Sequence, residues 1–140
     1  TLLLDAAKGA AAVWVSRQLY MESIVPIAGL FAVLGHIFPI WLHFKGGKGV
    51  ATALGALLAL NWMLGLTICA MWLAVFFFTR ISSLASLLAI GYSAIAAYLM
   101  DNYLTALLCL NLGALIIFTH RLNIQRLLTG QEHSFRKGAS

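Results

Sequence analysis

The run from Phe44 to Thr52 contains three glycines and two lysines between two strongly apolar stretches. Glycine lets the backbone adopt φ > 0 and brings its N–H groups close to a ligand without a Cβ in the way. Val50-Ala51-Thr52 leads into an apolar helical run, so the loop is expected to open onto a helix N-terminus, which attracts anions. These residues predict a cationic, phosphate-sized loop at a membrane surface.

This glycine loop lacks the pattern of a nucleotide-hydrolysing P-loop. A Walker A element needs G-x-x-x-x-G-K followed by Ser or Thr, whereas Gly49 follows Lys48 and no glycine stands five positions before Gly47. The sequence therefore disfavours ATP hydrolysis. A plainer interpretation stays open, in which the loop is a flexible turn whose lysines contact lipid phosphates.

Asp5, Lys8, His36 and Pro39 lie inside the first two apolar runs. Pro39 is expected to kink its helix, and His36 then either supplies a donor for the freed carbonyl or acts as a ligand. Asp5 and Lys8 stand three residues apart and can pair on one helix face. Ionisable groups at membrane depth are costly, so this pair either orients the bundle or contacts substrate.

Two further polar groups follow apolar runs. Ser82 and Ser83 are expected to cap a helix, with a second anion contact as the alternative. If the helix over 103–119 continues, His120 and Asn123 share a face with Arg126 beyond them. An imidazole, an amide and a guanidinium would form a polar wall for an anionic substrate. The plain interpretation is a solvated basic flank of a membrane helix.

The composition is that of an integral membrane protein. The 140 residues are 62% hydrophobic and 9% charged, with a mean hydropathy of +0.95, whereas a globular domain has roughly 25% charged residues. The net charge of +5 comes from too few side chains to follow a nucleic-acid backbone, so no nucleic-acid partner is expected. Cys69 and Cys109 lie in apolar runs and indicate packing, not a disulfide framework or metal site.

The apolar segments predict an all-α polytopic bundle that forms one domain over residues 1–140. A hydrocarbon core of ~30 Å takes about 20 helical residues, so the third segment is too short to span alone, and Asn61 separates it from the fourth. A single long tilted helix over 50–79 is the alternative, and it would invert the topology. The six expected helices lie near 1–16, 24–42, 50–60, 62–79, 81–100 and 103–119.

The basic residues predict the orientation of the six helices. One side holds the 43–49 loop, the turn at 80 and the C-terminal tail, while the other carries only Arg17 and ends in the Asp101-Asn102 loop. The positive-inside rule places the basic side in the cytoplasm. The basic residues on that side are Lys45, Lys48, Arg80, Arg121, Arg126, Arg136 and Lys137.

These polar blocks together resemble the bacterial acyl-phosphate:glycerol-3-phosphate acyltransferase family, the PlsY type. They fall in the family's order and spacing and span nearly all of the chain. The string from Gly46 to Thr52 is highly specific in a membrane context, and the tail motif is an independent match. The matching blocks are Asp5–Gly9, Gly35–Pro39, Phe44–Thr52, Ser82–Leu84, and His120-x-x-Asn123-Ile124-x-Arg126-Leu127 with Gly130-Gln131-Glu132.

The resemblance implies a multi-pass enzyme of the bacterial inner (plasma) membrane, with its active site and C-terminus in the cytoplasm. It would transfer an acyl group from acyl phosphate to the 1-hydroxyl of sn-glycerol 3-phosphate, giving lysophosphatidic acid and phosphate. This is the first acylation step of bacterial phospholipid synthesis. The family is expected to need no acyl-CoA, metal or organic cofactor. Its partners would be its two substrates, membrane lipid and, by functional coupling, the enzyme that makes acyl phosphate.

The resemblance also assigns roles to residues. His120 is the candidate catalytic residue, either as a general base on the glycerol hydroxyl or as a phosphate ligand, and we favour the second. His36 and Glu132 are expected to be structural residues beside the site. Acyl phosphate already has a good leaving group, so positioning and preorganised donors suffice without a protein nucleophile. Substrate binding is assigned to Gly46, Gly47, Lys48, Gly49, Thr52, Ser83 and Asn123.

The chain departs from the family pattern at its beginning. Family members have a seventh helix and a first cytoplasmic loop, Ser-Gly-Asn-x-Gly-Ala-Thr-Asn followed by an Arg, which has no match here. The start at Thr1 without Met fits this loss. We therefore expect an N-terminally truncated acyltransferase that is inactive as the chain alone.

Two other classes of function remain open from the sequence. One is a transporter or anion-binding subunit that uses the glycine loop at a broken helix, and the other is a structural subunit of a membrane complex. The enzyme requires the glycine loop and His120 to converge in one pocket at one membrane face. A transporter would place its site near the bilayer midplane, with access from both sides.

Overall fold

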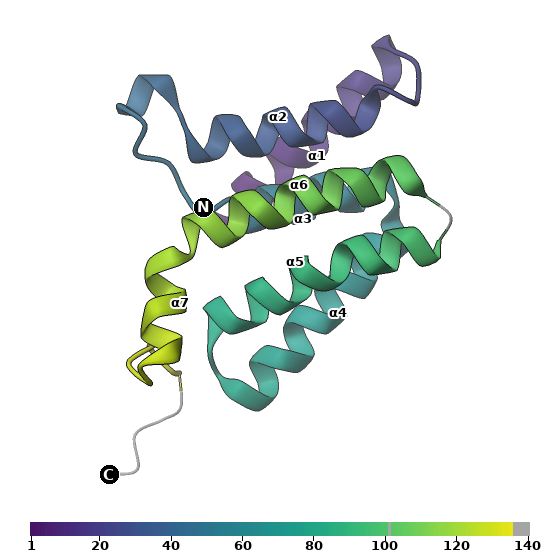
Figure 1. The fold of residues 1–140 in the computed structure, drawn as a ribbon. Coiled ribbons are helices and arrows are strands. Elements are labelled where there is room, and N and C mark those ends of the chain that lie inside the picture. The colour runs from purple at the N-terminus through teal and green to yellow at the C-terminus, as the bar shows by residue number, and fades with distance from the viewer. Residues whose placement is uncertain (101, 136–140) are drawn as a thin grey trace.

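A computed structural model describes residues 1–100 and 102–135 of the chain. Each of the six expected segments contains a helix, which confirms the all-α membrane fold (Figure 1). The expected positions of Asp101, Arg136 and Lys137 lie outside the described residues. Within those residues the elements are α1 (Leu2–Leu19), α2 (Val25–Ile37), the 3₁₀ helix η1 (Ile40–Leu42), α3 (Val50–Leu60), α4 (Trp62–Thr79), α5 (Ser82–Leu99), α6 (Tyr103–Thr119) and α7 (Arg121–Leu128).

Helix α6 runs through the middle of the bundle and contacts α2, α3 and α5 (Figure 1). Helix α1 packs against α2 and α3, while α4 packs against α3 and α5. Leu57, Leu64 and Leu112 are fully buried in the core between these helices. Apolar residues lie both in this core and on the outside of the bundle, so hydrophobicity alone does not identify the core residues.

The outer surface of the bundle is strongly apolar, as a lipid-facing surface must be. Trp14, Phe31, Trp62 and Phe78 are each more than half exposed. Three segments of the described chain are long and apolar enough to cross a membrane, namely Val25–Leu42, α4 and α5. Helices α6 and α7 would form a fourth span if this pair, bent by 67°, is counted as one.

Glycines allow α1 and α3 to pack at very short range. A Cβ on Gly9 would lie 2.1 Å from the Thr52 carbonyl oxygen, and one on Gly55 would lie 1.9 Å from the Ala6 carbonyl oxygen. Small residues permit such close approach of two helix backbones in membranes. This contact fixes α1 against the helix that begins at the glycine loop.

The chain breaks between α3 and α4, so the alternative of one long helix over 50–79 is wrong. Asn61 has an extended backbone, with φ −149°, and its side chain accepts a hydrogen bond from the Leu64 N–H at 3.1 Å. Arg17 donates to the carbonyls of Ala59 at 2.7 Å and Leu60 at 3.1 Å, while also pairing with Glu22. The last carbonyls of α3 are therefore satisfied by α1, which stabilises the break.

Pro39 ends α2 early, and the expectation that it would kink the helix is wrong. The helix stops at Ile37 because the residue before a proline is disfavoured in the α conformation. The chain then turns through η1, and His43 and Phe44 adopt positive φ of 51° and 61°. This turn brings the glycine loop back against the end of α2.

In the C-terminal half, the expected helix over 103–119 is present, but the capping expected of Ser82 and Ser83 is wrong and the condition of a straight continuation past 119 is not met. Ile81 is the N-cap residue of α5 and makes no side-chain cap, so Ser82 and Ser83 do not cap this helix. Helix α6 does not continue straight past Thr119, because the chain bends by 67° at His120 into α7. The bend turns α7 across the end of the bundle (Figure 1).

Candidate functional site

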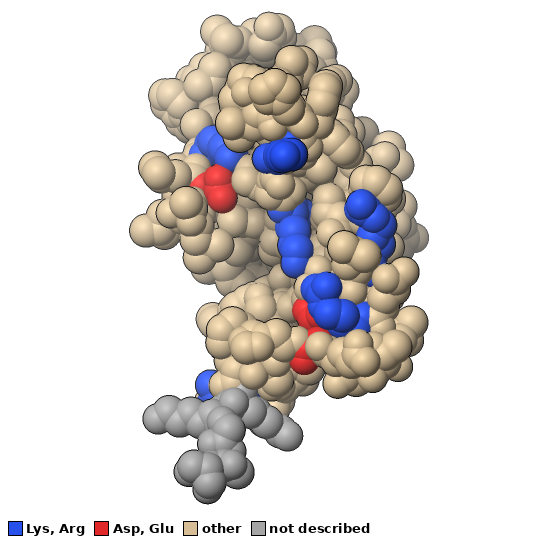
Figure 2. Space-filling view, turned by 90° about the vertical axis from the view of Figure 1, so that its left-hand side faces the viewer, with Lys and Arg blue, Asp and Glu red and all other residues tan. Residues whose placement is uncertain are grey.

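One end of the bundle brings together four segments that are distant in sequence. The Thr119 hydroxyl donates to the Lys48 carbonyl at 3.0 Å, which joins α6 to the glycine loop. The Phe135 N–H donates to the Arg80 carbonyl at 2.8 Å, which joins the tail to the α4–α5 turn. Figure 2 looks onto this end and shows Lys and Arg side chains grouped around the few acidic ones.

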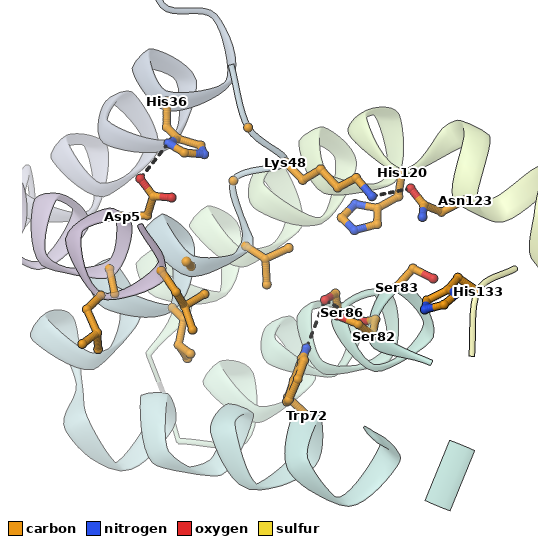
Figure 3. Close-up of a pocket in the computed structure, with 18 of the residues that line it drawn as sticks. Asp5, His36, Lys48, Trp72, Ser82, Ser83, Ser86, His120, Asn123 and His133 are labelled. Carbon is orange, nitrogen blue, oxygen red and sulfur yellow. Dashed lines mark hydrogen bonds and ion pairs between the residues drawn. The ribbon is translucent and has the colours of Figure 1, made fainter. Parts of the chain in front are cut away.

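A cavity of about 660 Å³ opens between α1–α3 on one side and α4–α5 on the other. Its lining has a polar part, here called the mouth, and an apolar part, here called the apolar wall, so one ligand could place an anionic group and a hydrocarbon chain in it together. The polar lining includes Glu132 and, labelled in Figure 3, Asp5, His36, Lys48, Ser82, Ser83, Ser86, His120, Asn123 and His133. The apolar lining includes Leu2, Leu3, Leu54, Leu58, Trp72 and Phe135.

Glu132 is the centre of a hydrogen-bond network at the mouth. Its Oε1 accepts from Ser83 Oγ at 2.6 Å and from Asn123 Nδ2 at 2.5 Å, and its Oε2 accepts from Arg126 Nε at 2.7 Å. Burial raises the pKa of Glu132, but these three hydrogen bonds and the Arg126 charge outweigh it and hold the pKa at about 2. The carboxylate therefore stays ionised and joins α5, α7 and the tail.

Lys48 is connected to this network through Asn123. Its ammonium donates to Asn123 Oδ1 at 2.6 Å (Figure 3). An ammonium only donates and a carboxylate only accepts, so the amide must turn its oxygen to Lys48 and its NH₂ to Glu132. Partial burial lowers the pKa of Lys48, Glu132 opposes that effect, and the Arg126 charge adds to it.

His120 lies beside Lys48, at the break between α6 and α7, and is only 2% exposed. Its Nδ1 is 2.9 Å from the Ile116 carbonyl oxygen. A carbonyl can only accept, so Nδ1 carries the proton and Nε2 is the acceptor nitrogen of the neutral ring. The helix break thus fixes both the position and the tautomer of this imidazole.

The glycines of the loop serve two different purposes. Gly49 has φ +85° and begins α3, as the sequence predicted for the loop. Gly46 and Gly47 lie outside the positive-φ region, so of the three glycines in the loop only Gly49 uses that conformational freedom. They are needed for close packing, because a Cβ on Gly46 would lie 2.1 Å from the His36 carbonyl oxygen.

The candidate residues divide into those that meet at the cavity and those that do not. Gly47, Lys48, Gly49, Ser83, His120 and Asn123 line it, as do His36 and Glu132. Gly46 and Thr52 do not line it. Thr52 is fully buried, and its hydroxyl has no hydrogen-bond partner within the described chain.

Asp5 and Lys8 form the expected pair, with Lys8 Nζ 2.7 Å from Asp5 Oδ1. The same carboxylate oxygen lies 3.6 Å from His36 Nδ1 (Figure 3). His36 therefore faces Asp5, and its backbone carbonyl accepts the Gly47 N–H at 3.3 Å. This cluster borders the cavity at the α1–α2 side, opposite Glu132.

Sequence reasoning missed Trp72, Ser86 and the aromatic tail. The Trp72 Nε1–H donates to Ser86 Oγ at 3.0 Å across the α4–α5 contact. Ser86 stands four residues after Ser82, and this helical spacing could have identified it. Trp72 had no such signal, because it lies within an apolar helix of nearly uniform hydrophobicity.

Relatives of this chain share its sequence over nearly its whole length. The family model described as glycerol-3-phosphate acyltransferase matches residues 1–130. The glycerol-3-phosphate acyltransferase of Jannaschia sp. is 48% identical over 137 residues, covering 98% of this chain and 68% of that protein. The one from Cereibacter sphaeroides is 44% identical over 140 residues, covering 100% of this chain and 67% of that protein. The chain spans about two thirds of the length of these curated relatives.

Solved structures agree with the sequence matches. The crystal structure of PlsY, an integral membrane glycerol 3-phosphate acyltransferase, in its glycerol 3-phosphate form superposes with a TM-score of 0.90 at 38% identity. The match covers 96% of this chain and 69% of that chain. A second structure of PlsY, in its lysophosphatidic acid form, has the same TM-score and identity and is covered over 70% of its length. With both the sequence and the fold matched over most of its length, this chain belongs to the glycerol-3-phosphate acyltransferase family.

Proposed function

We propose that the cavity is the site where an acyl group passes from acyl phosphate to the 1-hydroxyl of sn-glycerol 3-phosphate. The observation that carries the proposal is the polar network of Lys48, Asn123 and Glu132 beside His120, at the mouth of a cavity with an apolar wall. Both substrates are phosphates, and one also carries a hydrocarbon chain. A cavity with a polar mouth and an apolar wall can therefore accommodate the phosphates of both substrates and the hydrocarbon chain of one.

Acyl phosphate is the donor that fits these residues best. Its phosphate is already a good leaving group, so the protein must mainly orient the two substrates and stabilise developing charge. Lys48 has three N–H donors, of which one reaches Asn123. The other two are available for a substrate phosphate. The two PlsY structures are in a glycerol 3-phosphate form and a lysophosphatidic acid form, which supports the acceptor and the product.

The tautomer of His120 bears on its role in the proposed reaction. Neutral His120 presents Nε2 as an acceptor, so it can take the proton of the glycerol hydroxyl as that oxygen attacks the acyl carbon. It can hold a phosphate through Nε2 only when protonated, and its burial disfavours the charged ring. We therefore propose the base role for His120, in place of the phosphate contact expected from the sequence.

A transporter is not favoured. The polar network lies at one end of the bundle, between the glycine loop and α7, whereas a transporter binds its substrate near the bilayer midplane. We propose further that this end faces the cytoplasm of the bacterial inner membrane, because it carries Lys45, Lys48 and Arg80. Acyl phosphate would then be supplied there by the enzyme that makes it.

The acyl donor can be tested in membranes that contain the complete product of the gene that encodes this chain. Labelled glycerol 3-phosphate is supplied with acyl phosphate or with acyl-CoA, and lysophosphatidic acid is measured. We expect product with acyl phosphate alone. Product with acyl-CoA alone would rule out the proposed donor.

The role of Lys48 has a matched control in Lys45, which stands three residues earlier in the same loop. Lys48→Gln removes a charge-assisted phosphate contact, which corresponds to a loss of about 10- to 100-fold in kcat/KM for glycerol 3-phosphate. Lys45→Gln removes the same charge from a residue that does not line the cavity and should stay within about twofold. Equal effects of the two substitutions would contradict the assignment of this site.

A further inference from the structure

His36 lies against the glycine loop with its ring as well as its backbone. A Cβ on Gly47 would fall 2.2 Å from His36 Nε2 and 2.8 Å from Cε1. The Gly47 N–H also donates to the His36 carbonyl at 3.3 Å. The ring therefore occupies the space that any side chain at position 47 would need, so Gly47 and His36 fit together as a pair.

The other edge of the His36 ring faces α1. Its Nδ1 is 3.6 Å from Asp5 Oδ1, which also accepts from Lys8 Nζ at 2.7 Å (Figure 3). The His36 side chain is only 12% exposed. The imidazole is thus held between the carboxylate of α1 and the backbone of the glycine loop, and it has little room to turn.

Lys48 follows Gly47 directly and is tightly placed. Its carbonyl accepts from the Thr119 hydroxyl at 3.0 Å, and its ammonium reaches Asn123 at 2.6 Å. A displacement of the backbone at Gly47 would move both contacts. The position of the Lys48 ammonium therefore depends on the ring that packs against the preceding residue.

We infer that His36 is a positioning residue for Lys48: its ring, held by Asp5, fixes Gly47 so that the Lys48 ammonium faces the phosphate site. The inference rests on the proposed function, because it uses Lys48 as the phosphate ligand. His36 acts here through the loop and not by touching substrate. Glycine is then required at position 47 because the ring of one side chain, His36, packs against it.

The pairing of His36 with Gly47 can be tested by suppression. Gly47→Ala places a methyl group in the ring, and we expect kcat/KM for glycerol 3-phosphate to fall about tenfold or more, as overpacking does. The double variant Gly47→Ala with His36→Ala removes the obstruction. It should recover to within about threefold of His36→Ala alone. Failure of the double variant to recover would overturn the inference.

Gly46→Ala is the matched control for this suppression. Its Cβ would lie 2.1 Å from the His36 carbonyl oxygen and 2.3 Å from the Ile37 carbonyl oxygen. Both are backbone atoms that His36→Ala retains. The same suppressor should therefore fail to restore Gly46→Ala, and equal recovery of both glycine variants would contradict a contact specific to the ring.

A double-mutant cycle of His36→Ala and Lys48→Gln gives a second readout that does not require Gly47→Ala to fold. His36→Ala should raise KM for glycerol 3-phosphate more than it lowers kcat, and it should change KM less than about twofold once Lys48→Gln is present. Independent effects would indicate that His36 contacts the substrate itself. Absence of acyl transfer by the unaltered gene product that includes this chain would instead refute the proposed function.

Discussion

At the residue scale, the site consists of donors arranged around one carboxylate. Glu132 takes one hydrogen bond each from Ser83, Asn123 and Arg126, and this leaves Lys48 as the cation that borders the cavity with donors to spare. A buried carboxylate beside the proposed anion site would repel an anionic substrate if it were unpaired. Its three partners neutralise that repulsion while they hold Asn123 in the orientation that Lys48 needs.

His120→Gln separates the two roles considered for this imidazole. Glutamine can donate to a phosphate but cannot accept a proton, so a base role predicts a fall in kcat of about 10²- to 10⁴-fold with little change in KM for glycerol 3-phosphate. A phosphate-binding role predicts a rise in KM and a smaller fall in kcat. Steady-state kinetics at saturating acyl phosphate distinguishes the two outcomes.

At the element scale, the cavity depends on segments without regular structure being held against helix ends. The glycine loop packs on the end of α2 through Gly46 and Gly47. The tail at 131–135 is held by Glu132 and by the Phe135 N–H to the Arg80 carbonyl. Each contact joins a loop to an element distant in sequence, so the loss of one anchor should open the mouth without unfolding the bundle.

Protonation of Glu132 should release the tail in acid. Its folded-state pKa of about 2 lies below the ordinary 4.5, so its stabilising contribution is complete above pH 4.5 and is lost as the pH falls from 4.5 towards 2. Glu132→Gln should reduce the free energy of unfolding at pH 7 by about 1–3 kcal/mol. It should also make stability depend less on pH between 4.5 and 2. Thermal unfolding of the detergent-solubilised protein against pH measures both effects.

Glu22→Gln is the control for this acid effect. Glu22 pairs with Arg17 at the other end of the bundle, and its side chain is 67% exposed. An exposed ion pair contributes little to stability, so this variant should keep the acid transition of the unaltered protein. If Glu22→Gln reduced the pH dependence of stability as much as Glu132→Gln does, the loss of stability in acid could not be assigned to Glu132.

The contact between α1 and α3 makes a separate prediction about stability. Gly55→Ala would place a Cβ 1.9 Å from the Ala6 carbonyl oxygen, and the helices must separate, at a cost of about 1–3 kcal/mol. Gly113→Ala in α6 meets nothing within 4 Å and should be neutral or stabilising by up to about 1 kcal/mol. Unfolding in detergent compares them, and similar losses would contradict the close contact.

At the scale of the whole molecule, the two ends of the bundle differ in the polar groups that they hold. The glycine loop, α7 and the α4–α5 turn gather at one end with the basic side chains (Figure 2). At the other end, Arg17 satisfies the last carbonyls of α3 and pairs with Glu22. The cavity is lined by residues of the apolar outer surface, such as Leu2 and Leu3, as well as by the polar residues of the mouth. A lipid chain at the outer surface would therefore lie beside the polar mouth.

The proposed orientation can be tested by cysteine labelling in a Cys69→Ser, Cys109→Ser background. Lys45 and Ser23 are exposed at opposite ends of the bundle. A membrane-impermeant thiol reagent applied to spheroplasts should label Ser23→Cys but not Lys45→Cys, and inverted vesicles should show the reverse. Labelling of Lys45→Cys from the outer side of the membrane would refute the cytoplasmic location of the site.

Much of the fold and part of the site follow from local features of the sequence. Apolar length and the break at Asn61 defined six helices, because helix length and capping are properties of contiguous residues. The grouping of Lys48, His120 and Asn123 at one end followed from the alternation of helix direction. Gly49 behaves as predicted because positive φ at a helix start depends on local geometry alone.

Only the tertiary structure decided how the site residues are used. Ser83 was expected to cap a helix but donates to Glu132, 49 residues away. Gly47 was expected to allow either positive φ or close approach of a ligand, yet its φ is not positive and the His36 ring lies against it. The tautomer of His120 is fixed by the Ile116 carbonyl, at the bend that ends α6. Each of these depends on which groups pack together at short range, and that is set by the contacts of the folded bundle and not by the spacing of residues along the chain.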